Sequence, residues 1–76
     1  MKDLVMEIIS SYADIDTKKI DENITFEELN VDYDDIMELL IPIEEEFELH
    51  NATEIFKNIT VDLKLSRFIE IIKENL

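Results

Sequence analysis

Side chains that could act as nucleophiles or bases are few in this chain of 76 residues. There is no cysteine, His50 is the only histidine, and the serines are Ser10, Ser11 and Ser66. Nucleophilic catalysis needs a base within hydrogen-bond reach of the nucleophile and a third group that orients the base. The spacing does not predict such an arrangement, because two of the serines fall in a first predicted helix and His50 follows a second. We therefore expect that the protein is not an enzyme.

Carboxylates are abundant, and they raise the question of metal binding. The run DYDD at residues 32–35 resembles the start of a calcium-binding loop. Such a loop needs an oxygen ligand at its fifth position and glycine at its sixth, where this chain has Ile36 and Met37. Acids on an open helix are solvated, so we also expect no tuned acid–base pair. The sequence predicts no metal site and no cofactor.

Acidic residues outnumber basic ones by 20 to 7, which gives a formal net charge of −13. Ten of the acids lie between Glu27 and Glu48, a stretch without a single Lys or Arg. A surface this acidic repels phosphate backbones and anionic lipids, so we expect neither nucleic-acid nor membrane binding. The natural partner is a basic protein surface. The alternative is that the acids only keep a small protein soluble.

Helical periodicity predicts an all-α bundle of three main helices and one short helix, with a long loop after the first helix. The whole chain, residues 1–76, is short enough to form one domain. We expect a first helix over about residues 3–13, with an apolar stripe, and a long ordered loop over 14–31, pinned to the core by its apolar side chains. The stripe of the first helix consists of Leu4, Val5, Ile8, Ile9 and Tyr12.

A second helix begins at a cap on Asp32 and continues to about Phe47. Pro42 removes a backbone donor within it, so we expect either a kink there or two shorter helices. A short third helix, capped by Thr53, extends to residue 57 or 58. Residues 59–63 are expected to be extended, and a last helix covers about 64 or 65 to 75, burying Leu65, Phe68, Ile69 and Ile72 together with Leu76.

Glycine is absent from the chain. Any left-handed turn position must therefore be occupied by Asn or Asp, which tolerate that conformation best after glycine. The candidates are Asn23 and Asn30.

Met37 and Ile41 lie four residues apart, away from the centre of the second helix's apolar stripe. Apolar side chains that share an exposed face with acids are typical of a protein-binding helix, since the acids steer a partner and the apolar groups are buried by it. The alternative is a wide core stripe in a small bundle, in which both residues are part of the core.

The segment FEELNVDYDDIMELLIPIEEEF, residues 26–47, resembles an acyl carrier protein around its second helix. Carriers typically read F-x-x-D-L-G-x-D-S-L-D-x-V-E-L, followed by an E-E-E-F-type ending. One residue is missing before Asp32, and Asn30 stands where carriers have glycine. The predicted elements also fit, so the resemblance covers nearly the whole chain and implies a carrier-like fold. The matching positions are Phe26, Leu29, Asp32, Asp35, Glu38, Leu39, Glu44, Glu45, Glu46 and Phe47.

The resemblance breaks down at the residue that carries the prosthetic group. Carriers attach phosphopantetheine to the serine of D-S-L, and here Tyr33 occupies that position with Asp34 in place of the leucine. The resemblance therefore implies a binding module that has lost its cargo but kept the acidic second helix, which in carriers is read by basic patches on partner enzymes. The partner-binding residues that we predict are Asp32, Asp34, Asp35, Met37, Glu38, Ile41, Glu44 and Glu45.

We expect a non-catalytic module that binds and inhibits or regulates a basic protein, which would be a toxin, a nuclease or a carrier-dependent enzyme. Such a module is an immunity- or antitoxin-type inhibitor or an adaptor. The alternative is a genuine acyl or peptidyl carrier in fatty-acid or polyketide synthesis. We expect a cytoplasmic location, because Asp3 and Glu7 interrupt any signal-peptide pattern and no apolar run approaches the length that spans a bilayer.

The charge imbalance predicts that salt stabilises the fold. Raising the ionic strength from about 0.01 M to about 0.15 M shortens the screening length from about 30 Å to about 8 Å, which weakens self-repulsion among the acids. We expect the melting temperature near neutral pH, followed by circular dichroism, to rise over this range. Sodium chloride and choline chloride should act alike, because screening depends only on ionic strength. A melting temperature that falls on adding either salt would contradict the prediction.

Overall fold

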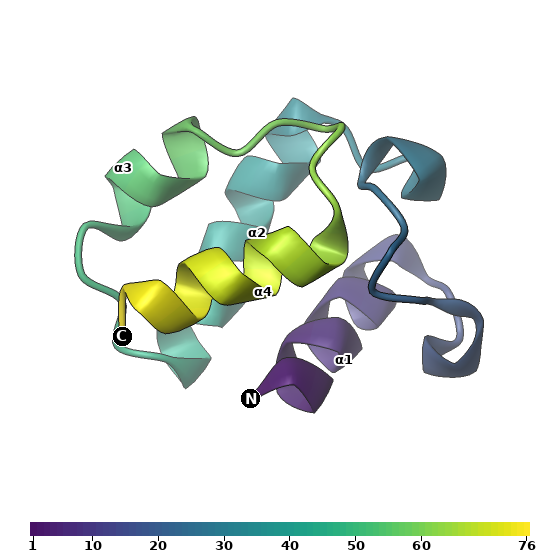
Figure 1. Cartoon of the computed structure of the whole chain (residues 1–76), viewed down its shortest axis with the longest axis horizontal. Coiled ribbons are helices and arrows are strands. Elements are labelled where there is room, and N and C mark those ends of the chain that lie inside the picture. The colour runs from purple at the N-terminus through teal and green to yellow at the C-terminus, as the bar shows by residue number, and fades with distance from the viewer.

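The computed structural model describes residues 1–76 and confirms an all-α bundle without β-strands. Four helices form it: α1 (Lys2–Ala13), α2 (Tyr33–Glu46), α3 (Ala52–Lys57) and α4 (Leu65–Glu74). The long loop between α1 and α2 contains two single-turn 3₁₀ helices, η1 (Thr17–Lys19) and η2 (Glu27–Leu29). In Figure 1 this loop, in blue, covers one end of the bundle, and α3, in green, covers the other.

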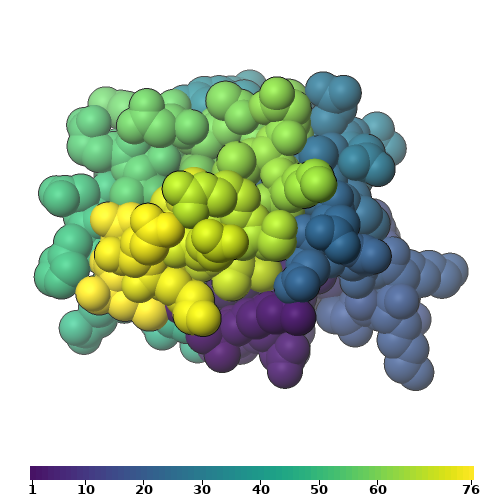
Figure 2. Space-filling view, in the orientation of Figure 1, coloured from purple at the N-terminus to yellow at the C-terminus, as the bar shows by residue number.

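Each long helix buries one stripe of its surface. In α1 the predicted stripe is only partly confirmed, because Val5 and Ile9 are buried and Ile8 packs against the core, whereas Leu4 lies outside the core cluster and Tyr12 is exposed. The buried stripe of α2 consists of Ile36, Leu39 and Ile43, at spacings of three and four residues. This helix packs against α1 on one side and α3 on the other, while α4 covers the opposite side of the bundle, the side seen in Figure 2. The other helices contribute Val5 and Ile9 of α1, Phe56 of α3, and the predicted residues Leu65, Phe68, Ile69 and Ile72 of α4.

The long loop is held in place by buried apolar side chains and by backbone hydrogen bonds to the segment before α4. Ile20, Phe26 and Leu29 are buried, which confirms that the loop is pinned to the core. The amide of Glu27 donates to the carbonyl of Val61 (2.8 Å), and the amide of Leu65 donates to the carbonyl of Ile24 (2.9 Å). These bonds satisfy backbone groups that a helix would otherwise pair internally.

Helix α2 is not divided at Pro42, so the expectation of two shorter helices is wrong. Pro42 cannot donate to the carbonyl of Glu38, which costs the helix one hydrogen bond. Leu39 and Ile43 lie on either side of this position and are both fully buried. Burying both on one stripe requires a continuous helix, and this packing outweighs the lost bond.

Helix α3 begins at Ala52, with Asn51 rather than Thr53 at its cap. Ala52 is buried, so the helix must start early enough to place it against the core. The segment after α3 is also not extended: Val61 and Asp62 form a turn, in which the Thr60 hydroxyl donates to the Asp62 carboxylate at 2.6 Å. Both errors concern short polar segments whose conformation is set by neighbouring elements.

Three residues other than glycine adopt a left-handed backbone: Asp14, Asn30 and Asn51, with φ of 56°, 60° and 57°. Asn30 is the position predicted from the sequence. The sequence also predicts Asn23, which does not adopt this conformation. The other two left-handed residues are not predicted: Asp14 follows the end of α1, and Asn51 precedes α3. The prediction for Leu76 is wrong as well, since its side chain is exposed at the end of the chain.

Phe68 of α4 lies at the centre of the core. Its ring packs edge to face against Phe26 of the loop (centroids 5.1 Å apart) and against Phe56 of α3 (5.6 Å). All three side chains are fully buried. One ring therefore joins the loop, the short helix and the last helix.

We expect Phe68→Leu to lower the free energy of unfolding by about 1–2 kcal/mol, because it loses both edge-to-face contacts and leaves a small cavity. Urea unfolding followed by circular dichroism would measure the change. Ile41→Ala is the control, because Ile41 is 62% exposed and its truncation should change stability by less than about 0.5 kcal/mol. Equal losses for the two variants would show that Phe68 has no central role.

Candidate protein-binding surface

The first turn of α2 is stabilised by two of the predicted partner-binding acids. The Asp32 carboxylate accepts a hydrogen bond from the amide of Asp35 (3.1 Å), and the Asp35 carboxylate accepts one from the amide of Asp32 (3.2 Å). This reciprocal pair is a capping box, and it confirms Asp32 as the helix cap. Asp32 and Asp35 thus have a structural role in the folded chain.

Five of the predicted residues form one exposed surface on α2, which we call the acidic face: Asp34, Glu38, Ile41, Glu44 and Glu45. Positions three, four and seven residues apart share one side of a helix, and here that side lies away from the buried stripe. Ile41 is 62% exposed and is the most exposed large apolar side chain of the protein. The structure therefore places an apolar group among acids in contact with solvent.

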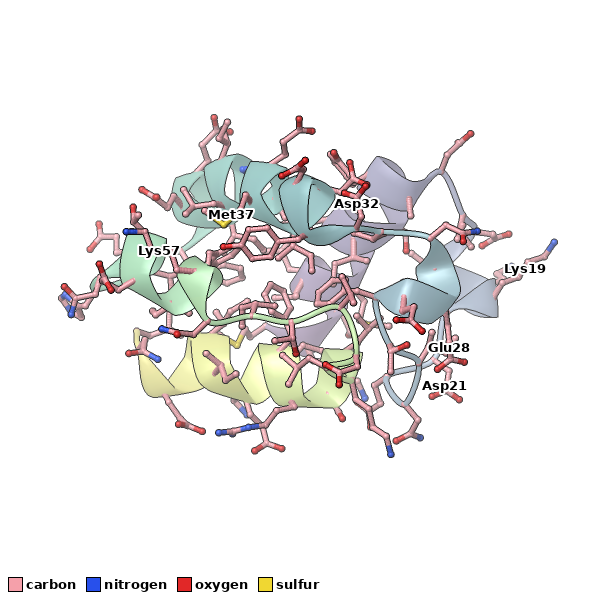
Figure 3. The ribbon with its side chains drawn as sticks, turned by 90° about the horizontal axis from the view of Figure 1, so that it is seen from above. Lys19, Asp21, Glu28, Asp32, Met37 and Lys57 are labelled. Carbon is pink, nitrogen blue, oxygen red and sulfur yellow. The ribbon has the colours of Figure 1, made fainter.

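Met37 lies at the edge of this surface. It is half-buried and packs against the core, on the side of α2 that faces α3, close to Lys57 (Figure 3). The interpretation of a wide core stripe thus holds for Met37, whereas Ile41 is outside the core. Tyr33 is on the same side as Met37, is 43% exposed, and donates from its hydroxyl to the carbonyl of Lys57 at 3.4 Å.

None of the acids on α2 forms an ion pair. The four ion pairs of the structure are Lys2–Glu22, Lys57–Glu54, Arg67–Glu70 and Arg67–Glu74. Lys19, on η1, points away from the bundle at the end remote from α3 (Figure 3). The charge of the acidic face is therefore not compensated locally, and its field extends into solvent over about the screening length.

Tyr12 of α1 makes an interaction that the sequence did not predict. Its hydroxyl carries one proton and lies within hydrogen-bond distance of both Asp35 Oδ1 (2.9 Å) and Glu38 Oε2, so the two carboxylates share this donor. These bonds favour the ionised carboxylate, so the Tyr12 hydroxyl, followed by the Asp32 backbone, lowers the pKa of Asp35 below its usual range. The same two bonds, to Glu38 and then to Asp35, raise the pKa of Tyr12 well above the usual 10.0.

The expectation that these acids are merely solvated is therefore wrong for Asp35. Tyr12 ends the apolar stripe of α1, and for that reason the sequence placed it in the core. It is instead partly exposed at the contact with α2. The only feature of the sequence that points to this interaction is the polar hydroxyl at the end of the stripe. That hydroxyl could have been paired with Asp35 and Glu38 only if it were known that the end of α1 lies beside the start of α2.

The structure does not bring together the groups considered for catalysis or metal binding. The Ser10 hydroxyl is buried and donates to the carbonyl of Met6 at 2.8 Å. His50 follows the end of α2, and its amide donates to the carbonyl of Asn75 at 3.1 Å. No group of three or more His, Asp or Glu side chains is arranged to hold a metal ion. None of the helices combines the length and apolar character needed to cross a membrane.

Comparison with known proteins finds no family model, curated protein or solved structure that matches this chain. The resemblance to acyl carrier proteins therefore rests on the residues of segment 26–47 and on the order of the helices.

We expect Tyr12→Phe to raise the pKa of Asp35 towards the usual value for aspartate, because the main cause of its lowering is removed. Carboxyl-carbon NMR titration would measure this. Tyr33→Phe is the matched control, since the Tyr33 hydroxyl donates to a backbone carbonyl and not to an acid. An unchanged Asp35 titration in Tyr12→Phe would show that the hydroxyl does not hold that carboxylate.

The same variant should change how stability depends on pH. A lowered folded-state pKa stabilises the fold above the unfolded-state pKa of aspartate, about 3.9, and this contribution is lost as pH falls through the folded-state value. The raised pKa of Tyr12 stabilises the fold below about pH 10, and this contribution is lost as pH rises further. The difference in free energy of unfolding between the native chain and Tyr12→Phe, measured by urea unfolding at several pH values, should therefore be largest between about pH 3.9 and about pH 10.

Proposed function

We propose that the chain is a non-catalytic binding module that engages a basic surface of a partner protein through the acidic face of α2. The observation that carries the proposal is Ile41, an exposed apolar side chain surrounded by acids that no base of the chain neutralises. A single exposed apolar side chain is common on protein surfaces, so the argument depends on its combination with the unpaired acids, which could steer a basic partner that then buries Ile41.

The chemistry of the face specifies the partner. An apolar pocket would receive Ile41, and Lys or Arg around that pocket would pair with Asp34, Glu38, Glu44 or Glu45. Charges at the rim of an interface mainly accelerate association, while the buried apolar anchor slows dissociation. The net charge of −13 adds long-range steering towards a cationic protein.

The resemblance to acyl carriers supports the same assignment, because the second helix is the surface that partner enzymes of carriers recognise. With Tyr33 in the serine position, the module would carry no phosphopantetheine. It would act as an immunity- or antitoxin-type inhibitor of a toxin or nuclease, whose phosphate-binding site carboxylates can occupy, or as an adaptor that occupies carrier-dependent enzymes.

A genuine acyl or peptidyl carrier is the second candidate. One observation favours it: Tyr33 begins α2, at the position of the carrier's serine, and is 43% exposed. This candidate requires a covalent arm on the chain. A carrier would therefore have a larger molecular mass than the unmodified chain that the binding module requires.

We expect native mass spectrometry of the protein isolated from its own cells to show an unmodified chain in a stoichiometric complex with a basic protein. Raising the salt concentration should weaken that complex, because steering and rim ion pairs are screened. A covalent pantetheine adduct would instead establish the carrier function and exclude the proposed one.

Once the partner has been identified, Ile41→Ala tests whether the acidic face is the interface. We expect it to weaken the complex about tenfold or more, as for an apolar anchor near the centre of an interface, with no loss of stability. Leu76→Ala is the matched control, because Leu76 is also exposed but lies at the end of the chain beyond α4. Equal affinities for Ile41→Ala and the native chain would exclude the acidic face as the interface.

A further inference from the structure

A second surface with binding chemistry lies on the other side of α2, where this helix meets α1. A groove of about 430 Å³ runs between the two helices. The α1 wall consists of Leu4, Glu7, Ile8 and Ser11, and Pro42 lies opposite on α2. The apolar surface of the groove comes mainly from Leu4, Ile8 and Pro42. Tyr12 stands at one end and Glu46 lines the other part of the α2 wall. None of the residues of the acidic face lines this groove.

The register of the two helices sets the length of the groove. Tyr12 bonds to Asp35 and Glu38, near the start of α2, whereas Glu46 is the last residue of that helix. The helices therefore run antiparallel, and the groove extends from Tyr12 back to Leu4 along α1. Tyr12 is eight residues after Leu4, so at 1.5 Å per residue the two are about 12 Å apart along the helix axis, or slightly more than two helical turns.

Acids lie along the whole rim of the groove, around its apolar centre. Asp35 and Glu38 meet at the Tyr12 end, and Glu7 and Glu46 lie along the rest of the rim. No Lys or Arg lines the groove. A second copy of the chain carries the same charge of −13 and is repelled, so self-association does not account for this surface.

The Tyr12 end is suited to a cationic side chain. The Tyr12 ring is 37% exposed, and an aromatic face attracts Lys or Arg. Asp35 and Glu38 each keep acceptor positions besides the one that Tyr12 occupies. Pro42 has no amide hydrogen to donate to the Glu38 carbonyl, so that oxygen lacks its usual helical donor and adds a further acceptor nearby.

We propose that this groove binds a helical segment of a partner protein in which one apolar residue is flanked by Lys or Arg about one turn away on each side. Basic residues at i and i+8 are about 12 Å apart on a helix, which matches the length of the groove. The apolar residue at i+4 then lies between Ile8 and Pro42. This surface shares only Glu38 with the acidic face, since Glu38 meets Tyr12 at the end of the groove and no other residue of that face lines it.

The probe is a synthetic alanine-rich helical peptide with Arg at i and i+8 and Leu at i+4. The control peptide has the same composition, with Leu moved to i+6, on the opposite side of the helix. Affinities are measured by fluorescence anisotropy at about 0.15 M salt, where long-range attraction is screened. We expect the first peptide to bind more tightly than the control, because only it can insert Leu between the helices while both Arg side chains reach acids.

Glu46→Lys and Glu45→Lys form a matched pair of variants. Both are exposed glutamates in the last turn of α2, and both substitutions change the net charge equally, but only Glu46 lines the groove. Glu46→Lys should weaken binding of the first peptide about fivefold, within the range for one charge contact, while Glu45→Lys should change it less than about twofold.

Equal binding of the two peptides, or equal losses for the two variants, would overturn the proposal, because either result indicates attraction by charge alone. A peptide whose binding is weakened by Ile41→Ala and not by Glu46→Lys would also overturn it, and would place that peptide on the acidic face instead. The groove and the acidic face are thus tested by different variants, so a result that overturns one proposal does not overturn the other.

Discussion

The edge-to-face packing of Phe68 against Phe26 and Phe56 is the interaction on which the rest of the structure depends. A chain of 76 residues buries a small core, so each large side chain carries a large share of the stability. The internal hydrogen bonds of the long loop and of the short α3 fix their local turns but do not attach them to the rest of the bundle. The loop and α3 keep their positions because each contributes one ring to a cluster centred on α4, and α2 is in turn supported between α3 and α1.

The position of α2 determines where the charge of the protein lies. Burial of Ile36, Leu39 and Ile43 turns the opposite side of the helix to solvent, and with it acids that no base neutralises. Self-repulsion among these acids costs stability in a small protein, yet the seven bases pair on other elements or extend into solvent. Such a distribution has no advantage for folding, and it is one of the grounds on which we propose a role in partner binding for the acidic face.

The acids of α2 divide into two groups with different surroundings. Asp32 and Asp35 cap the helix, and Asp35 with Glu38 accepts the Tyr12 hydroxyl, so these carboxylates help to join α2 to α1. Asp34, Glu44 and Glu45 make no such contacts and remain available to a partner. Glu38 belongs to both groups, because it is exposed and also bonded to Tyr12. It lies between the acidic face and the groove, so a partner at either surface would act on the same hydroxyl.

The sequence by itself determined the helix class, the buried stripe of α4, the Asp32 cap and the left-handed Asn30, because these depend on local periodicity and on the backbone preferences of single residues. Only the tertiary structure decided that Pro42 lies within one continuous helix and that Asn51 rather than Thr53 precedes α3, since packing on both sides outweighed local preference. It also decided that Met37 is part of the core while Ile41 is exposed, and that Tyr12 meets Asp35 and Glu38. Those outcomes depend on which helices become neighbours and in what register, and contacts between residues 23 or more positions apart leave no periodic trace in the sequence.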